Sequence, residues 1–97
     1  MEINKMTDRE LLELAAKAVG LVPSEHDGVI YVGFGSREWN PITDDGDALR
    51  LAVKLDILNM NSILNKYIIE EQRRNLRDVA TRRAIVRAAA EIGRERK

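Results

Sequence analysis

The chain has 97 residues, of which 44% are hydrophobic, 33% charged and 4% aromatic, and this length suits one domain because two separate cores would each be too small to be stable. It contains no cysteine, which excludes disulfides, thiol nucleophiles and thiolate metal sites and fits a reducing compartment. Sixteen basic and sixteen acidic side chains give a formal net charge of zero, which excludes a strong electrostatic field from the protein as a whole.

The first predicted element is a helix over residues 7–19. Thr7 and Glu10 have the spacing of a capping box, in which each side chain binds a backbone N–H at the start of a helix. Leucine, alanine and valine residues follow at helical spacing, and Gly20 stands where a left-handed residue commonly ends a helix. The sequence therefore predicts both ends of this helix.

A strand over residues 29–34 and a second helix over 46–55 are predicted next. β-Branched and aromatic residues are concentrated in the strand. The acidic residues at 44–47 match the positive end of a helix dipole, so we interpret them as capping residues. A calcium loop is excluded, because no glutamate stands at the twelfth loop position counted from either Asp44 or Asp45.

Residues 56–72 allow two interpretations. Strands over 56–61 and 66–72 would form a hairpin, which the three asparagines of the segment and the β-branched residues after Tyr67 favour. One long helix over 48–72 is the alternative. We favour the hairpin, which would add two strands to the sheet.

The last predicted element is a helix over residues 76–94, with Asn75 as its N-cap. One broad face of this helix is apolar, and the opposite face collects arginines. Arg82 falls inside the apolar arc, so its side chain must extend to solvent or pair with an acid. Together these elements predict a single α+β domain over residues 1–97, of order α-β-α-β-β-α, with helices packed on a small antiparallel sheet.

The zero net charge hides an uneven distribution of charges. Residues 1–50 carry ten acidic and five basic side chains, and residues 51–97 carry six acidic and eleven basic ones, so the two halves carry −5 and +5. One interpretation is that the halves face one another in the fold or in a homodimer, where opposite charges within a Debye length partly cancel. The other is an electrostatic partner for the basic half.

The candidate binding residues are four arginines of the last helix and the one tryptophan of the chain. They are Arg77, Arg83, Arg87, Arg94 and Trp39. Arginine suits bidentate contacts with carboxylates and phosphates, and tryptophan and arginine dominate binding hot spots. The same arginines also fit a solvated helix with local pairs, and Trp39 also fits the core. Solvent exposure of Trp39 distinguishes an anchor from a core residue.

No catalytic or metal site is predicted. His26 is the only histidine and lies in a polar turn with no nucleophile pattern beside it, so we expect a solvated surface residue. Zinc would need further nitrogen or sulfur ligands. Residues 33–36 faintly resemble a phosphate-binding loop, but residues 39–41, Trp-Asn-Pro, follow where a helix would have to begin. We expect a non-enzymatic protein with no cofactor and no metal.

Three segments of the chain resemble a known group of proteins. They are residues 7–18 (TDRELLELAAKA), 39–55 (WNPITDDGDALRLAVKL) and 80–93 (ATRRAIVRAAAEIG). In these segments the chain is similar to small uncharacterised proteins of temperate bacteriophages and prophages, and more distantly to phage ABA-sandwich domains. The resemblance implies a phage origin and a fold in which helices cover a small antiparallel sheet. It implies no particular activity.

These observations lead to one expected function and one alternative. We expect a phage accessory protein that binds and modulates a macromolecular partner, such as a host or defence protein. The alternative is a nucleic-acid-binding module that uses the arginine-rich last helix, although neutral charge and the lack of a helix-turn-helix pattern count against it. No apolar run approaches the roughly 18 residues of a membrane span and no signal-peptide core is present, so we expect no membrane partner and a location in the host cytoplasm.

Overall fold

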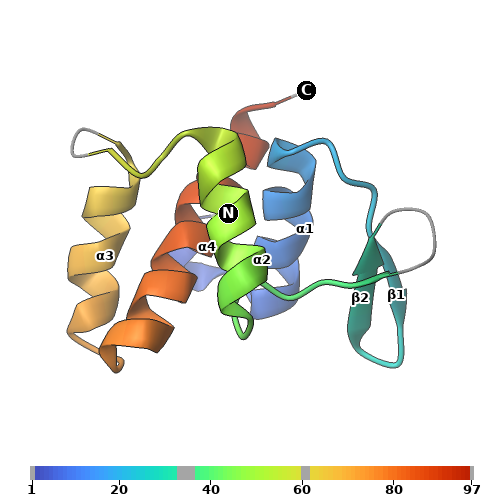
Figure 1. The fold of residues 1–97 in the computed structure, drawn as a ribbon, viewed down its shortest axis with the longest axis horizontal. Helices are drawn as coiled ribbons and strands as arrows, with labels where there is room; N and C mark the ends of the chain where they lie inside the picture. Colours follow the sequence, from blue (N-terminus) through green and yellow to red (C-terminus); the bar gives the residue numbers. More distant parts are fainter. Residues whose placement is uncertain (1, 33–36, 60–61, 97) are drawn as a thin grey trace.

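The computed structural model describes residues 2–32, 37–59 and 62–96. In chain order its elements are the 3₁₀ turn η1 (Ile3–Lys5), α1 (Asp8–Ala18), β1 (Ser24–His26), β2 (Val29–Val32), β3 (Arg37–Glu38), α2 (Asp45–Leu55), α3 (Leu64–Gln72) and α4 (Arg77–Glu95) (Figure 1). The α+β class is therefore confirmed. The order of the elements is α-β-β-β-α-α-α rather than the predicted α-β-α-β-β-α.

Helix α1 begins and ends as its local sequence predicts. Thr7 Oγ1 accepts a hydrogen bond from Glu10 N at 3.2 Å, and Glu10 Oε1 accepts one from Thr7 N at 3.0 Å, which completes the capping box. After the helix, Gly20 has a φ of +76°, and Leu21 N donates to Ala16 O at 2.9 Å. This left-handed ending satisfies carbonyl groups of the last helical turn.

The sheet is a three-stranded antiparallel meander with β2 in the centre. Strand β2 confirms the predicted strand as far as Val32, and residues 33–34 lie outside the described residues. Ile30 and Val32 point into the core. Strand β1 lies where the sequence analysis expected a turn, because Asp27 and Gly28 both have positive φ and form the tight turn that right-twisted strands need.

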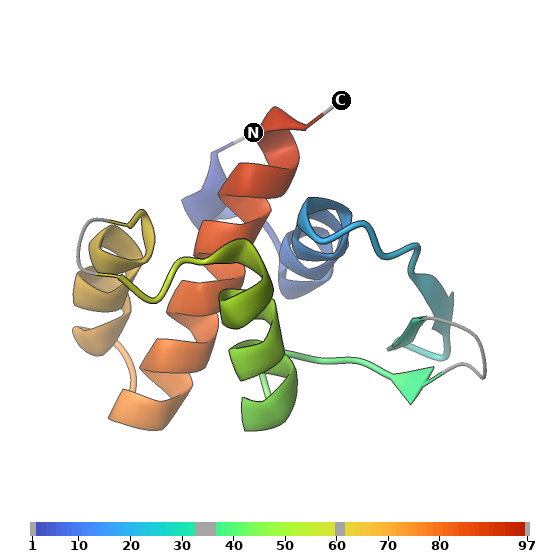
Figure 2. The same cartoon turned by 45° about the horizontal axis from the view of Figure 1, so that its top comes forward.

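Helix α4 is the centre of the molecule and packs against α1, α2, α3 and η1. In both views α1 lies on one side of it and α3 on the other, while the sheet lies beyond α1 (Figure 2). Small buried residues allow this enclosure on several sides: Ala80, Ala84, Ala88, Ala89, Ala90 and Gly93. The closest approach is at Gly93, where an added Cβ would lie 1.9 Å from Leu14 O in α1.

The predicted hairpin over 56–72 is wrong. Helix α2 ends at Leu55, with Asp56 in the left-handed conformation at a φ of 55°, so the single long helix is excluded too. The segment predicted as the strand 66–72 belongs to α3 instead. The buried residues of α3 are Leu64, Tyr67 and Glu71. They are three and four positions apart, which places them on one helix face against α4. Tertiary packing on this face overrides the strand propensity of Tyr67 and the isoleucines that follow it.

Helix α4 spans Arg77–Glu95, close to the predicted 76–94, but its predicted N-cap is wrong. Leu76 occupies the capping position and makes no side-chain capping bond. The Asn75 side chain instead donates from Nδ2 to Glu71 Oε1 at 2.9 Å, which ties the turn to the end of α3. Within the described ranges, no helix is both long enough and apolar enough to span a membrane.

Candidate functional site

Arg87, predicted on the outer face of α4, is buried instead. It is 5% exposed, with Nη1 2.9 Å from Glu71 Oε2 and Nη2 3.0 Å from Glu70 Oε2. Its guanidinium carbon lies 4.5 Å from the centre of the Tyr67 ring. The helix α3 that the sequence analysis did not expect covers this side of α4, so Arg87 holds the two helices together and is not available to a partner.

Arg83 and Arg82 connect the basic half of the chain to the acidic half. Arg83 makes a bidentate contact with Asp8, with Nη2 2.9 Å from Oδ1 and Nη1 3.3 Å from Oδ2, and this hydrogen-bonded pair raises the pKa of Arg83. Arg82 Nη1 lies 2.7 Å from Asp45 Oδ1, while Arg82 Nε donates to Ile42 O at 2.8 Å. Arg82 thus pairs with an acid, which is one of the two outcomes predicted from its position in the apolar arc. These contacts favour the interpretation that the two halves face one another within the fold.

Arg77 and Arg94 remain exposed. Arg94 lies 4.0 Å from Glu91. Arg77 is close in sequence to two further exposed arginines, Arg73 and Arg74, at the turn between α3 and α4. We call Arg73, Arg74 and Arg77 the basic turn, and no side-chain ion pair joins them to any other part of the described chain.

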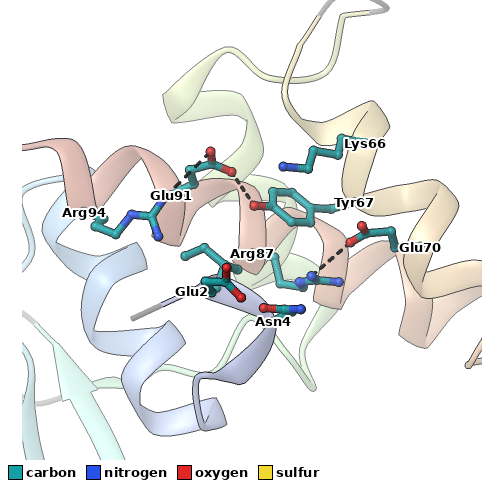
Figure 3. A pocket seen from close by; sticks show the side chains of 9 residues that line it. Glu2, Asn4, Lys66, Tyr67, Glu70, Arg87, Glu91 and Arg94 are labelled. Atoms are coloured by element: carbon teal, nitrogen blue, oxygen red, sulfur yellow. Dashed lines mark hydrogen bonds and ion pairs between the residues drawn. The ribbon is translucent and has the colours of Figure 1, made fainter.

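A polar pocket of about 270 Å³ lies between η1, α3 and α4 (Figure 3). Its charged side chains balance, with three basic ones (Lys66, Arg87, Arg94) and three acidic ones (Glu2, Glu70, Glu91). The Tyr67 hydroxyl donates a hydrogen bond to Glu91 Oε2. Burial, together with this bond to a carboxylate, raises the pKa of Tyr67 and keeps the phenol protonated at neutral pH. Within the pocket Arg87 pairs with Glu70 and Tyr67 bonds to Glu91, which links α3 to α4, and a protonated phenol there is no general base.

Trp39 belongs to the core. It is 4% exposed, and its backbone N–H donates to Ile30 O at 2.8 Å, which extends the pairing between β2 and the segment after β3. The predicted role of Trp39 as an exposed anchor is therefore corrected to a core role. Trp39 also lines a larger hollow on the surface.

That hollow is an apolar groove of about 730 Å³ between α2, the sheet and the end of α1. We call it the basic-rimmed groove. It is lined by the apolar residues Val19, Leu21, Val32, Trp39, Leu49, Leu51 and Val53 and by the charged residues Arg37, Asp47, Arg50 and Lys54. Leu49 and Val53, four positions apart on α2, are 55% and 60% exposed. The sequence does not distinguish Leu49 and Val53 from the buried apolar residues of this helix, and only the packing of α2 reveals that they face solvent.

Asp47 positions the basic side chains at the rim of this groove. Its side chain is 4% exposed, and Oδ1 accepts hydrogen bonds from Arg37 Nη2 at 3.0 Å and Arg50 Nη2 at 2.8 Å. Oδ2 accepts one from Asn40 N at 3.0 Å. Burial raises the pKa of Asp47, but the bonds from Asn40, Arg50 and Arg37 outweigh it and hold this pKa below its usual range. Asp44, in turn, accepts from Asp47 N at 2.7 Å and caps α2, as the acidic run predicted.

The described residues contain no group of three histidine, aspartate or glutamate side chains placed to hold a metal ion. His26 is exposed on β1, in edge-to-face contact with Tyr31. The glycine-rich residues 33–36, weighed above as a phosphate loop, lie outside the described residues. Comparisons of the chain with protein-family models, with curated proteins and with solved structures found no match.

Proposed function

We propose that this protein binds a protein partner through the basic-rimmed groove and modulates that partner by occupancy rather than by catalysis. The observation that carries the proposal is the exposure of Leu49 and Val53 beside an apolar hollow. When a partner covers such side chains, binding gains roughly 25 cal/mol of favourable free energy per Å² of apolar surface removed from water. Contiguous apolar surface rimmed by polar groups is typical of sites where another protein binds.

The pairing of charged groups supports occupancy rather than catalysis. In the groove, Asp47 is bonded to Arg37 and Arg50, and in the polar pocket Glu91 accepts from Tyr67. Nucleophilic catalysis needs a nucleophile in reach of a base, and general acid–base catalysis needs a group whose pKa lies near the working pH. No histidine, cysteine, serine or threonine is among the described residues that line the two hollows.

The expected partner is a host or defence protein. This part of the proposal comes from the resemblance of three segments to small phage proteins. Such a partner would be met in the cytoplasm of the host cell.

Capture from a bacterial host extract tests the proposal. The baits are the wild-type protein, the double variant Leu49→Glu/Val53→Glu and the control Ile69→Glu, which alters an equally exposed apolar residue on α3. We expect wild type and Ile69→Glu to retain the same protein and the groove variant to lose it at least tenfold, with all three baits equally folded by circular dichroism. Equal retention by all three would contradict the proposal.

Nucleic-acid binding is the second candidate function, and the basic turn is the observation that favours it. Arg73, Arg74 and Arg77 are exposed and close in sequence, whereas Arg83 and Arg87 are engaged within the fold. Retention on DNA and RNA across a salt gradient tests this candidate. A phosphate contact contributes a slope of about −0.7 to −0.9 in a plot of log affinity against log salt. The triple variant with alanine at the basic turn should flatten that slope, and no retention of wild type at low salt would exclude this function.

A further inference from the structure

We infer that the basic-rimmed groove takes an acidic amphipathic segment of its protein partner. The apolar side chains of that segment enter the hollow, and its Asp or Glu side chains meet the rim. The inference rests on the proposed function and specifies the chemistry of the partner.

The inner wall of the groove defines the apolar half of the partner. Val32, Trp39 and Leu51 are buried behind it, while Leu49 and Val53 lie along its open side. Residues four apart on a helix lie on the same face, so these two form one short stripe. A volume of about 730 Å³ falls within the range of about 300–1,000 Å³ that is typical of ligand pockets. Such a space accepts apolar side chains from a folded or folding segment.

The rim defines the acidic half of the partner. The Arg37 and Arg50 side chains are 56% and 62% exposed, whereas the Asp47 carboxylate behind them is 4% exposed. The surface of the rim therefore presents positive charge, to which exposed Lys54 adds. Each guanidinium has five N–H donors and gives one of them to Asp47. Donors that remain are held in place for carboxylates of a partner.

The same charges disfavour a second copy of this chain as the occupant. A two-fold dimer through α2 would bring the same surface patch of both copies together. The basic rims of both copies would then enter one interface, with Asp47 turned inward. Like charges across an interface suppress association, so an acidic partner fits better than a copy of the protein.

A peptide selection tests this inference with the full-length protein. A displayed library of random peptides of about 16 residues is selected on wild type, after counter-selection on Leu49→Glu/Val53→Glu to remove peptides that bind elsewhere. We expect the retained peptides to combine apolar residues with an excess of Asp and Glu. Their affinity should fall about tenfold in Lys54→Glu and stay unchanged in Arg77→Glu, a matched charge reversal outside the groove, and the loss should shrink as salt rises.

The outcomes separate the inference from the proposed function. Groove-dependent peptides that are neutral or basic, or that bind Lys54→Glu as well as wild type, would overturn the acidic segment and leave the groove as a binding site. A selection that yields no groove-dependent peptide would overturn both. Self-association of wild type in sedimentation, abolished by Leu49→Glu/Val53→Glu, would assign the groove to a second copy and overturn both the acidic segment and the separate partner.

Discussion

Arg87 and Glu71 form an ion pair that is buried on both sides, with Nη1 2.9 Å from Oε2 and side-chain exposures of 6% and 5%. The pair joins α4 to α3, and the second guanidinium nitrogen reaches Glu70 on the same helix. A buried ion pair contributes little net stability compared with apolar packing, but breaking it leaves a charge without its partner. Arg87 therefore fixes how α3 lies on α4.

The first prediction concerns Arg87→Leu, which removes one side of this pair. Breaking a buried pair costs about 3–5 kcal/mol, and we expect the lower end because Arg83 Nε lies 3.6 Å from the other oxygen of Glu71. The double variant Arg87→Leu/Glu71→Leu should recover most of the loss. Urea unfolding measures both, with Arg77→Leu on the exposed surface as control. A loss in Arg87→Leu no larger than that of the control would show that the pair does not hold the helices.

The second prediction concerns the contact of α1 with α4 at Gly93. Alanine normally stabilises a helix interior by about 1 kcal/mol relative to glycine. Here the added Cβ would lie 1.9 Å from Leu14 O, a backbone atom that cannot move alone. We expect Gly93→Ala to destabilise the protein by about 3 kcal/mol, at the upper end of the usual cost of overpacking. Thermal unfolding measures the change.

Gly20→Ala is the matched comparison for Gly93→Ala. Its added Cβ would meet nothing within 4 Å, but the φ of +76° strains any L side chain, so we expect a smaller loss of about 1 kcal/mol. Equal stability of Gly93→Ala and wild type would show that the two helices separate easily.

The parts of the fold that were predicted from sequence depend on local signals. The Thr7–Glu10 capping box and the acidic cap at Asp44 act within one helical turn, so their residues alone specify where α1 and α2 begin. Strand β1 was missed although Asp27-Gly28 is a strong hairpin signal. Helix α3 was missed because Tyr67 and the isoleucines after it favour strands, and only α4 supplies the surface that makes them helical.

The candidate site was harder to predict because it depends on which faces are covered. Helical periodicity placed Arg77, Arg83, Arg87 and Arg94 opposite the apolar face of the last helix, but it could not show that α3 covers Arg87 or that Asp8 binds Arg83. In the same way, the apolar sequence of α2 does not reveal that Leu49 and Val53 are exposed. Periodicity identifies the faces of a helix, and the arrangement of all helices decides which faces remain open.

The third prediction concerns the hydrogen bond from Tyr67 to Glu91. Removing a hydrogen bond to a charged group costs about 1.5–3 kcal/mol, so Tyr67→Phe should lower the free energy of unfolding by about 1.5 kcal/mol at neutral pH. The pKa of Tyr67 is raised in the folded state from its ordinary value of 10.0. The contribution is therefore complete below about pH 10 and is lost as pH rises from there towards the folded-state pKa.

Urea unfolding of wild type and Tyr67→Phe between neutral pH and about pH 11 measures this difference. Tyr31→Phe is the control, because no hydrogen bond joins the Tyr31 hydroxyl to another described residue. We expect its difference from wild type to be small. If the Tyr67→Phe difference stays constant across this range, the phenol is not held in its protonated form by Glu91.

The last prediction concerns Asp47, which holds the arginines at the rim of the groove. Its folded-state pKa is lowered below the ordinary value of 3.8, so its contribution is present above about pH 4 and is lost as pH falls through the folded-state pKa. Asp47→Asn should therefore lower the free energy of unfolding by about 2 kcal/mol at neutral pH, the cost of weakening bonds to a charged group. Below pH 4 the difference from wild type should shrink.

Urea unfolding between about pH 2.5 and 7 measures this difference, with exposed Asp27→Asn as a control expected to change stability by less than about 0.5 kcal/mol. A difference that does not depend on pH would mean that an ionised Asp47 carboxylate does not stabilise the fold through Arg37 and Arg50. Asp47 would then not be the residue that positions the arginines of the rim.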